Sequence, residues 1–436
     1  MTTTKEIIDA GQNVERQLGC TLFPDLQLED LRRLPIEELQ RCYRREMESI
    51  MTLHAMLASG ATPADLTSLV RTISIHGRER PGSHREILGF PIKAICSNIR
   101  RQDVDWNQFN FERSGIGGEG DIVIAKALSD RGSTNHLESQ SGREVRLFKG
   151  DHFMTVMGHR HSGTSEYGEL PGGQMELGQD TEVDLLCHGG ILGRGICIPH
   201  NKPVKTFFKA RVAALLRNGD RNLNLLDLYP SWDQEMQPSA PIIFNCGTSA
   251  EIGKTTSASS IIRALKRKGM TIGAVKLAGT GRYRDLLSLR DAGADLYFDF
   301  PDVGLPSTYT SPSRSYPAAI TLLNKLNHEG VGVIVAEMGG DIIEANIPSI
   351  LRSPEVMRYA KGIVHSSADI LGILGSLQRY REFGVHVPVK LTLPKDRNNA
   401  GTRGRLQHEN LSGFDVMDER ECDAVVEELF SQDGME

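Results

Sequence analysis

The chain has 436 residues, with 50 Lys and Arg against 56 Asp and Glu, so its formal net charge is −6. At about 100–200 residues per domain, this length predicts two or three domains with enough material for a buried core. The slightly acidic balance argues against a general nucleic-acid or anionic-membrane binder, because such proteins usually carry a basic excess.

The seven cysteines are odd in number and form no CxxC pair, so they predict reduced thiols rather than a disulfide framework or a zinc site. The polar N-terminal stretch lacks the apolar core of a signal peptide. No run approaches the roughly 18 apolar residues that a membrane span needs. The protein is therefore expected to be cytoplasmic and not to bind a membrane.

Residues 1–112 are expected to form a helical N-terminal region. From Ile36 to Leu57, apolar residues recur at steps of three and four, which predicts a long amphipathic helix opened by Pro35. A second helix is expected from Pro63. The charged face of the long helix is interpreted as solvated, and a partner surface is the alternative.

Residues 113–235 are expected to form a smaller α/β domain. Short apolar runs alternate there with Gly-rich turns, which predicts strands. A helix is expected over residues 204–219, closed by Gly219. The polar stretch 228–241 carries three prolines and is expected to be a linker.

In residues 240–436, strand, loop and helix signals follow one another repeatedly, which predicts a nucleotide-binding domain with a mainly parallel sheet. Its first apolar strand covers residues 242–246, and a loop of small residues, 247–253, leads into a helix. This order places backbone N–H groups and a helix N-terminus around a phosphate, so a phosphate-binding loop is expected. The candidate nucleotide-binding residues are Gly247, Thr248, Ser249, Ala250, Glu251, Ile252, Gly253, Lys254, Thr255 and Thr256.

Lys254 and Thr255 open this helix and carry the chemistry of the loop. The amine of Lys254 would reach the β- and γ-phosphates, and the hydroxyl of Thr255 would ligate Mg²⁺. The spacing departs from the strict GxxxxGK[ST] motif, because Thr248 stands where the first glycine should be and Gly247 lies one residue earlier. A chance GKT sequence between a strand and a helix is the alternative interpretation.

Two further strands of the same sheet lead to candidate site residues. One strand ends in Lys276 and is followed by a Gly-rich loop and Asp285, and a very apolar strand later ends in Glu337. Acidic residues at the carboxyl ends of parallel strands lie where ligands bind in open α/β sheets. Both carboxylates are therefore candidate Mg²⁺ ligands or activators of the reacting group, and a surface charge is the alternative for each.

These motifs resemble those of dethiobiotin synthetases, P-loop enzymes of the MinD-like branch, over residues of about 241–400. GTSAEIGKT is similar to the family's GTDTEVGKT loop, RDLLSL to its SDALAL, and AEMGG to its VEGAGG. The resemblance implies Mg-ATP, with Lys254 and Lys276 as catalytic residues that stabilise phosphoryl charge. The residues that it implies around the metal are Thr255, Asp285 and Glu337.

The leading hypothesis is an ATP- and Mg-dependent ligase, which activates a carboxylate or carbamate as a phosphoric anhydride for attack by an amine. The substrate would be a small molecule of carboxylate or amino-acid type. The loop is also similar to that of D-glutamate N-acetyltransferases, which implies acyl transfer from coenzyme A as an alternative. A nucleotide-binding accessory protein is the third possibility.

The first ~240 residues have no counterpart in dethiobiotin synthetases. They would supply a second substrate site or a dimer contact, and a homodimer is expected. A Gly-rich turn there, residues 189–195, is either an anion site or a plain tight turn. Cys187 has His188 beside it, but adjacent residues of a strand face opposite sides, so a Cys/His nucleophile pair is not favoured.

Three histidines also cluster in the same part of the chain, at positions 152, 159 and 161. In a strand, His159 and His161 would point to one face, so a metal pair is possible. Ordinary polar surface histidines are the alternative.

Overall fold

The computed structural model describes residues 9–14, 50–51, 54–56, 58–59, 85–394 and 398–431. The chain divides into two compact units, Met1–Ser83 and His84–Glu436. The helix expected from Pro63 lies outside the described residues, and so does most of the long helix expected from Ile36. Of the latter, residues 50–51 and 54–56 are described, and they are helical.

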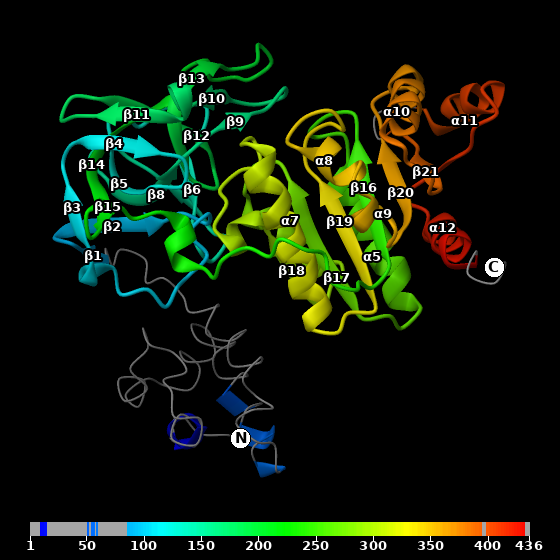
Figure 1. The fold of residues 1–436 in the computed structure, drawn as a ribbon, viewed down its shortest axis with the longest axis horizontal. Coiled ribbons are helices and arrows are strands. Elements are labelled where there is room, and N and C mark those ends of the chain that lie inside the picture. The colour runs from blue at the N-terminus through cyan, green and yellow to red at the C-terminus, as the bar shows by residue number, and fades with distance from the viewer. Residues whose placement is uncertain are drawn as a thin grey trace, which may run out of the picture. The chain divides into compact units, whose positions relative to one another are not determined.

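The second unit begins with a barrel domain, residues 85–235, built on a closed five-stranded barrel (Figure 1). Its strands pair in the order β8-β5-β14-β12-β13, and the barrel closes because β13 also pairs with β8. That closing pair is parallel and the other four are antiparallel. The barrel strands are β5 (Ile122–Ala127), β8 (His152–Met157), β12 (Glu182–Cys187), β13 (Ile191–Cys197) and β14 (Phe208–Asn218).

Shorter elements surround the barrel and include the hairpin β6–β7, which borders the site described below. The remaining strands are β1 (Arg85–Ile87), β2 (Phe90–Ile95), β3 (Asn110–Glu112), β4 (Gly115–Gly118), β6 (His136–Glu138), β7 (Glu144–Arg146), β9 (Arg160–His161), β10 (Tyr167–Glu169), β11 (Gln174–Leu177) and β15 (Arg221–Asn222). The 3₁₀ turns are η1 (Trp106–Gln108), η2 (Pro171–Gly173) and η3 (Leu225–Leu228).

The prediction of a helix over residues 204–219 is wrong, because Phe208–Asn218 form strand β14. This strand pairs with β5 on one side and β12 on the other. Phe208, Ala210 and Val212 are buried and the residues between them are half-buried, which is the two-residue period of a strand. Ala, Leu and Arg favour helices, but pairing on both sides overrides that weak preference. The expected α/β domain is therefore all-β, since residues 85–235, all described, contain no α-helix.

The sheet of the barrel domain also begins before residue 113, where the boundary was expected. β2 pairs with β8, and β3 pairs with β14, so both belong to the same sheet as the barrel strands. β1 and β3 have only three residues each, which is too short for a periodic signal in the sequence.

The rest of the second unit is a sheet domain, which contains seven parallel strands in the order β18-β17-β19-β16-β20-β21-β22. This confirms the expected parallel sheet. Its strands are β16 (Ile242–Gly247), β17 (Ile272–Ala278), β18 (Leu296–Asp299), β19 (Val333–Met338), β20 (Ala360–Ser366), β21 (Val389–Thr392) and β22 (Gly413–Phe414). The helices are α5 (Lys254–Arg267), α6 (Tyr283–Asp291), α7 (Pro312–His328), α8 (Ile347–Leu351), α9 (Pro354–Met357), α10 (Ile370–Phe383), α11 (Asn399–His408) and α12 (Glu419–Ser431), with the 3₁₀ turn η4 (Phe300–Val303).

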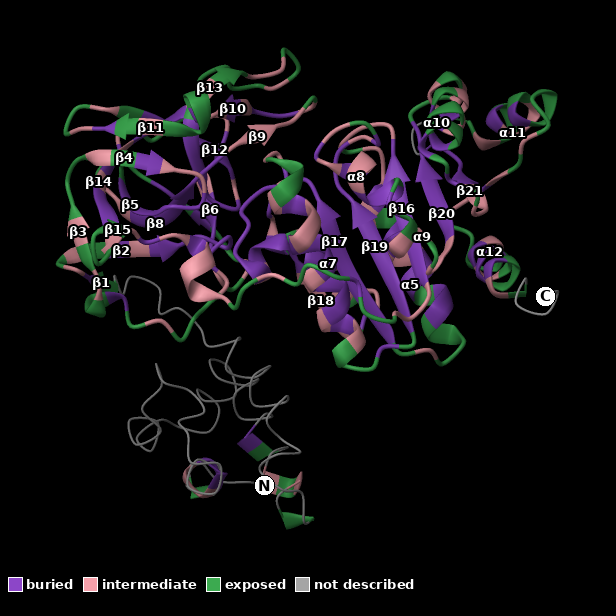
Figure 2. Cartoon of the chain, viewed as in Figure 1, coloured by how far each residue is buried: buried purple, intermediate pink, exposed green. Residues whose placement is uncertain are grey.

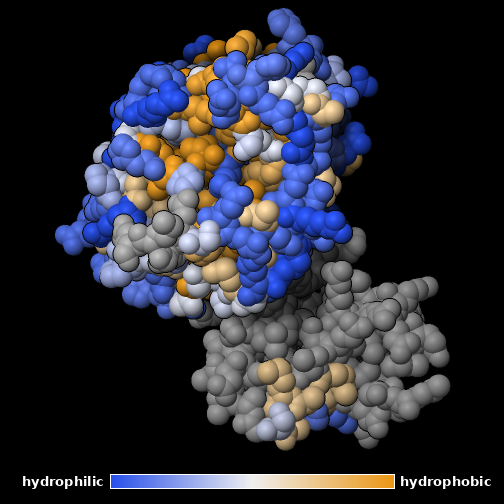
Figure 3. All heavy atoms as spheres, turned by 90° about the vertical axis from the view of Figure 1, so that its right-hand side faces the viewer, coloured by the Kyte–Doolittle hydropathy of each residue, from blue (hydrophilic) through white to orange (hydrophobic). Residues whose placement is uncertain are grey.

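Helices cover both faces of this sheet, and each face has its own hydrophobic core. Ile243 of β16 packs into the core formed with α5, α6 and α12, whereas Phe244 packs into the core formed with α7 to α10. The central strands are accordingly buried along their length (Figure 2). At the α10–α12 end, hydrophobic residues lie among hydrophilic ones at the surface (Figure 3), and Leu371 and Met417 are exposed there.

The linker expected over residues 228–241 is packed against the sheet domain. The indole Nε1 of Trp232 donates to the carbonyl of Val303 at 2.7 Å, and the backbone N–H of Gln237 donates to Asn324 Oδ1 at 2.9 Å. The part of this segment around Trp232 and Gln237 is therefore fixed on the sheet domain. Among the described residues, no helix combines the length and apolar character needed to cross a bilayer.

Candidate phosphate-binding site

The loop 247–253 connects β16 to α5 as the sequence predicts. Glu251 and Gly253 have left-handed backbone angles, with φ of 62° and 102°. At Gly247 a Cβ atom would lie 2.8 Å from the carbonyl oxygen of Ser366, so glycine is required there by space. No described side chain caps the start of α5, which leaves its first N–H groups free to receive an anion.

Lys254 is the first residue of α5 and is only 6% exposed. Its Nζ donates to the backbone carbonyls of Ser249 at 2.5 Å and Gly340 at 2.8 Å. Burial lowers the pKa of this amine, although the nearby Glu337 partly offsets the effect. An arriving phosphate would stabilise the charged form that burial penalises, so the position suits an anionic ligand.

Lys276 and Glu337 are direct neighbours on the paired strands β17 and β19. The Nζ of Lys276 lies 2.5 Å from Asp285 Oδ2, and the hydroxyl of Thr255 donates to Glu337 Oε1 at 3.3 Å. Burial alone would lower the pKa of Lys276, but Asp285 and Glu337 raise it above its usual value. The structure thus brings together the five catalytic and metal-site residues that the sequence predicts.

One carboxylate oxygen of Glu337 is available to bind a metal ion. Its Oε2 is buried and has no hydrogen-bond partner among the residues that the structure describes. A buried carboxylate oxygen without a partner costs free energy, and a divalent cation would supply the missing contact. A hydroxyl and one or two carboxylates are the protein ligands that Mg²⁺ takes alongside substrate phosphates, so Thr255, Asp285 and Glu337 fit this ion. This candidate site has only two carboxylates, Asp285 and Glu337. Larger groups, of three or more His, Cys, Asp and Glu residues that could hold a metal ion, do not occur within the described ranges.

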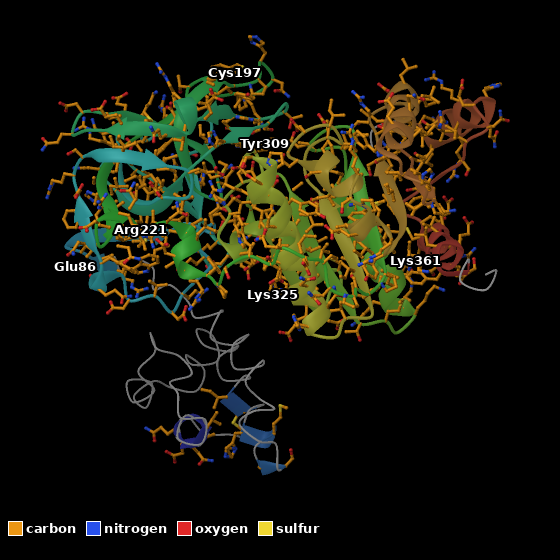
Figure 4. The ribbon with its side chains drawn as sticks, in the orientation of Figure 1. Glu86, Cys197, Arg221, Tyr309, Lys325 and Lys361 are labelled. Atoms are coloured by element: carbon orange, nitrogen blue, oxygen red, sulfur yellow. The ribbon has the colours of Figure 1, made fainter. Side chains whose placement is uncertain are left out.

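These groups line a cavity of about 730 Å³ that the barrel domain and the sheet domain share. Tyr309, at the junction of the two domains in Figure 4, is part of its wall. Of the predicted loop residues, those that line the cavity are Ala250, Glu251, Gly253, Lys254, Thr255 and Thr256. The barrel side contributes residues that sequence reasoning did not assign to the site, among them Arg160, Ser162, Thr164, Ser165, His188 and Gly189.

The Gly-rich turn at residues 189–195 includes a contact that joins the two domains. A Cβ atom at Gly189 would lie 2.0 Å from the carbonyl oxygen of Gly281 in the sheet domain. Across the same boundary, the buried guanidinium of Arg100 lies 2.7 Å from Asp299. The glycine at position 189 therefore allows the close backbone approach that shapes the cavity.

We expect Gly189→Ala to lower the free energy of unfolding by about 2–3 kcal/mol, because its methyl group would overlap the Gly281 backbone. Gly163→Ala is the matched control, since a Cβ there meets no atom within 4 Å and should change stability by less than about 0.5 kcal/mol. Urea unfolding of both variants measures the difference. Equal stabilities would contradict the close contact.

Glu138, on the hairpin of the barrel domain, caps a helix of the sheet domain. Its Oε2 accepts from the backbone N–H of Tyr283 at 2.6 Å, and its Oε1 from that of Arg284 at 2.9 Å. These are the first two N–H groups of α6, the helix that carries Asp285 in its first turn. A buried carboxylate from one domain thus fixes the helix that holds the charged partner of Lys276.

Of the three histidines considered as a metal group, His159 and His161 face each other with ring centroids 6.0 Å apart, but the residues that the structure describes include no group of three or more His, Cys, Asp and Glu that could bind a metal ion. His152 packs against Phe90, with ring centroids 5.5 Å apart, and His161 stacks on Tyr167 at 4.5 Å. His159 Nδ1 accepts from the backbone N–H of Leu170 at 3.2 Å. These contacts favour the interpretation as ordinary polar histidines.

Cys187 lines the cavity but is not prepared to react. Burial raises the pKa of its thiol, which keeps the sulfur protonated at neutral pH. The Cys/His nucleophile pair that the strand geometry disfavours therefore gains no support.

Neither a family model nor a curated protein matches the chain. Solved structures match part of it. The signal recognition particle 54 kDa protein from Aeropyrum pernix K1, in complex with GDP, is 18% identical with a TM-score of 0.29, covering 48% of this chain and 51% of its own. The present chain thus spans about half the length of that protein.

Two further solved structures are similar at the same level. Chloroplast FtsY from Physcomitrella patens is 15% identical with a TM-score of 0.31, and covers 47% of this chain and 70% of its own. A plasmid partition protein from Borrelia burgdorferi is 11% identical with a TM-score of 0.31, and covers 44% and 100%. None of the three is a dethiobiotin synthetase, and TM-scores this low identify no function.

Proposed function

We propose that the cavity binds a Mg-nucleoside triphosphate and that the protein is an ATP-dependent ligase, which activates a small carboxylate or carbamate. The observation that supports this most is the convergence of Lys254, Lys276, Asp285 and Glu337 beside a phosphate-binding loop. Two lysines offset the charge of a transferring phosphoryl group, and two carboxylates provide metal ligands.

The proposed reaction has two steps. A carboxylate oxygen of the substrate attacks the γ-phosphorus, and the bond to the β–γ bridging oxygen breaks, so that ADP leaves with the electron pair. An amine then attacks the acyl carbon, inorganic phosphate leaves, and the nitrogen gives its proton to solvent. Lys254 and Lys276 would hold the non-bridging oxygens during transfer.

Mg²⁺, if held by Thr255, Asp285 and Glu337, would add charge neutralisation on the phosphates. In the structure, Lys276 holds Asp285 and Thr255 holds one oxygen of Glu337, so the other Glu337 oxygen is the readiest ligand. The homodimer expected from the sequence remains a prediction.

The test incubates the protein with ATP, Mg²⁺ and a panel of carboxylates and amines, and measures ADP release. We expect substrate-dependent release that requires Mg²⁺ and falls about 100-fold in Glu337→Gln, because a metal ligand is lost. Glu329→Gln, an exposed position just after α7, is the control and should retain full activity.

Two other outcomes would replace the proposal. Consumption of acetyl-CoA without ADP release would favour the acyltransferase alternative. Slow ATP hydrolysis that no small molecule stimulates would favour a nucleotide-binding accessory protein.

A further inference from the structure

The barrel side of the cavity carries an arginine with an unused donor. Arg160 Nη1 donates to Glu166 Oε2 at 2.7 Å and to the carbonyl of Leu186. Its buried Nε has no partner in the part of the chain that the structure describes. Burial would raise the pKa of Glu166, but Arg160 holds it at about 2, so this pair stays ionised at neutral pH. Arg160 therefore keeps a donor for a second anion.

Two more unused donors lie on the same cavity. The hydroxyl of Thr164 is buried and bonds to no described residue. Arg282 donates through Nη2 to Glu144 at 3.0 Å, while its buried Nε has no partner among the described residues. A buried donor without an acceptor costs free energy, so these groups are prepared for a ligand that accepts hydrogen bonds.

His188 lines the same cavity as the two arginines. Its Nδ1 must donate to the carbonyl of His136, 3.1 Å away, because a carbonyl can only accept. Burial, with Arg282 and Arg160, lowers the pKa of this imidazole to about 4. The His188 ring is therefore neutral at pH 7. The positive charge on this wall of the cavity comes from Arg160 and Arg282.

We propose that Arg160, Thr164 and Arg282 bind a second carboxylate of the substrate, remote from the one that is activated, which makes the substrate class a dicarboxylate. The inference rests on the proposed function, which assigns the reacting carboxylate to the two lysines. Lys254 and Lys276 belong to the sheet domain, whereas Arg160 and Thr164 belong to the barrel domain. Arg282 belongs to the sheet domain, where it precedes α6, and its Nη2 reaches Glu144 of the barrel domain, so it lies at the boundary of the two domains.

The test measures binding of succinate and glutarate to the full chain by calorimetry without nucleotide, with butyrate as the monocarboxylate control. We expect at least one dicarboxylate to bind at least tenfold more tightly than butyrate. Thr164→Val should weaken that binding about tenfold, since the variant loses a hydrogen bond to a charged group but none within the described protein. Arg282→Gln should weaken it by tenfold or more.

Thr206→Val and Arg211→Gln are matched controls, because both residues belong to the barrel domain but do not line the cavity. Each should bind as the wild type does. Thermal unfolding verifies that all four variants fold.

Binding of a fluorescent ATP analogue to the same variants separates this inference from the proposed function. We expect less than a twofold change. The inference is overturned if neither dicarboxylate binds more tightly than butyrate, or if Thr164→Val and Arg282→Gln weaken the ATP analogue instead, which would assign these donors to phosphate. If the dicarboxylate binds as expected but no ATP turnover occurs, the proposed function fails and the dicarboxylate site stands.

Discussion

Lys254→Ala is expected to reduce nucleotide-dependent turnover by at least about 100-fold, the usual cost of removing one donor to a transition-state charge. The amine of Lys254 is anchored between the carbonyls of Ser249 and Gly340 at the start of α5, where the phosphates would lie. Lys276, the other described lysine of the cavity wall, lies on β17 and has its own position in the proposed site, so it does not replace an amine at the start of α5. Steady-state ADP release measures the loss.

Lys268→Ala is the matched control for this variant. Lys268 follows the same helix and pairs with Glu427 at 2.8 Å on the surface, so its removal should leave turnover unchanged. Urea unfolding is measured in parallel, because the substitution leaves the carbonyls of Ser249 and Gly340 without this donor, and turnover is compared under conditions in which the variant is folded. Turnover within threefold of wild type would remove Lys254 from the proposed chemistry.

Glu138→Ala is expected to lower the free energy of unfolding by about 3 kcal/mol, because two buried N–H groups of α6 would lose a charged acceptor. The same change should reduce ADP release, since the first turn of α6 positions Asp285 beside Lys276. Urea unfolding and the activity assay together measure both effects.

Glu144→Ala provides a control from the same hairpin. Glu144 is the direct cross-strand partner of Glu138, but its side chain is 39% exposed and pairs with Arg282 near the surface. Its loss should cost no more than about 1 kcal/mol. Equal destabilisation by the two variants would contradict the capping role of Glu138.

The sheet-domain side of the site could be predicted because its residues are encoded by local patterns. The expected strand over residues 242–246 is β16, and the expected helix from Lys254 is α5. The sequence pattern places Lys276 and Glu337 close together because strand ends of a parallel sheet meet at one edge, and the two are neighbours on β17 and β19. The sequence does not predict that Lys276 pairs with Asp285, because this contact depends on how the loop between β17 and α6 orients the helix.

The barrel side could not be predicted, because its residues meet only through tertiary contacts. Arg160 and His188 lie far from the phosphate-binding loop in sequence, and no motif links either of them to that loop. The helix expected over residues 204–219 failed for a related reason, since partner strands on both sides determine the conformation of β14. Adjacent glycines at 189 and 190 indicate close packing, but the sequence does not show that Gly189 packs against Gly281 and Gly190 against Cys96.

The two tryptophans of the chain offer a way to observe the two domains separately. Trp106 is buried within the barrel domain, and Trp232 lies in the connecting segment against the sheet domain. Single Trp→Phe variants would therefore report fluorescence from one domain at a time. Because the domains share buried contacts such as Arg100–Asp299, both reporters should change at the same denaturant concentration.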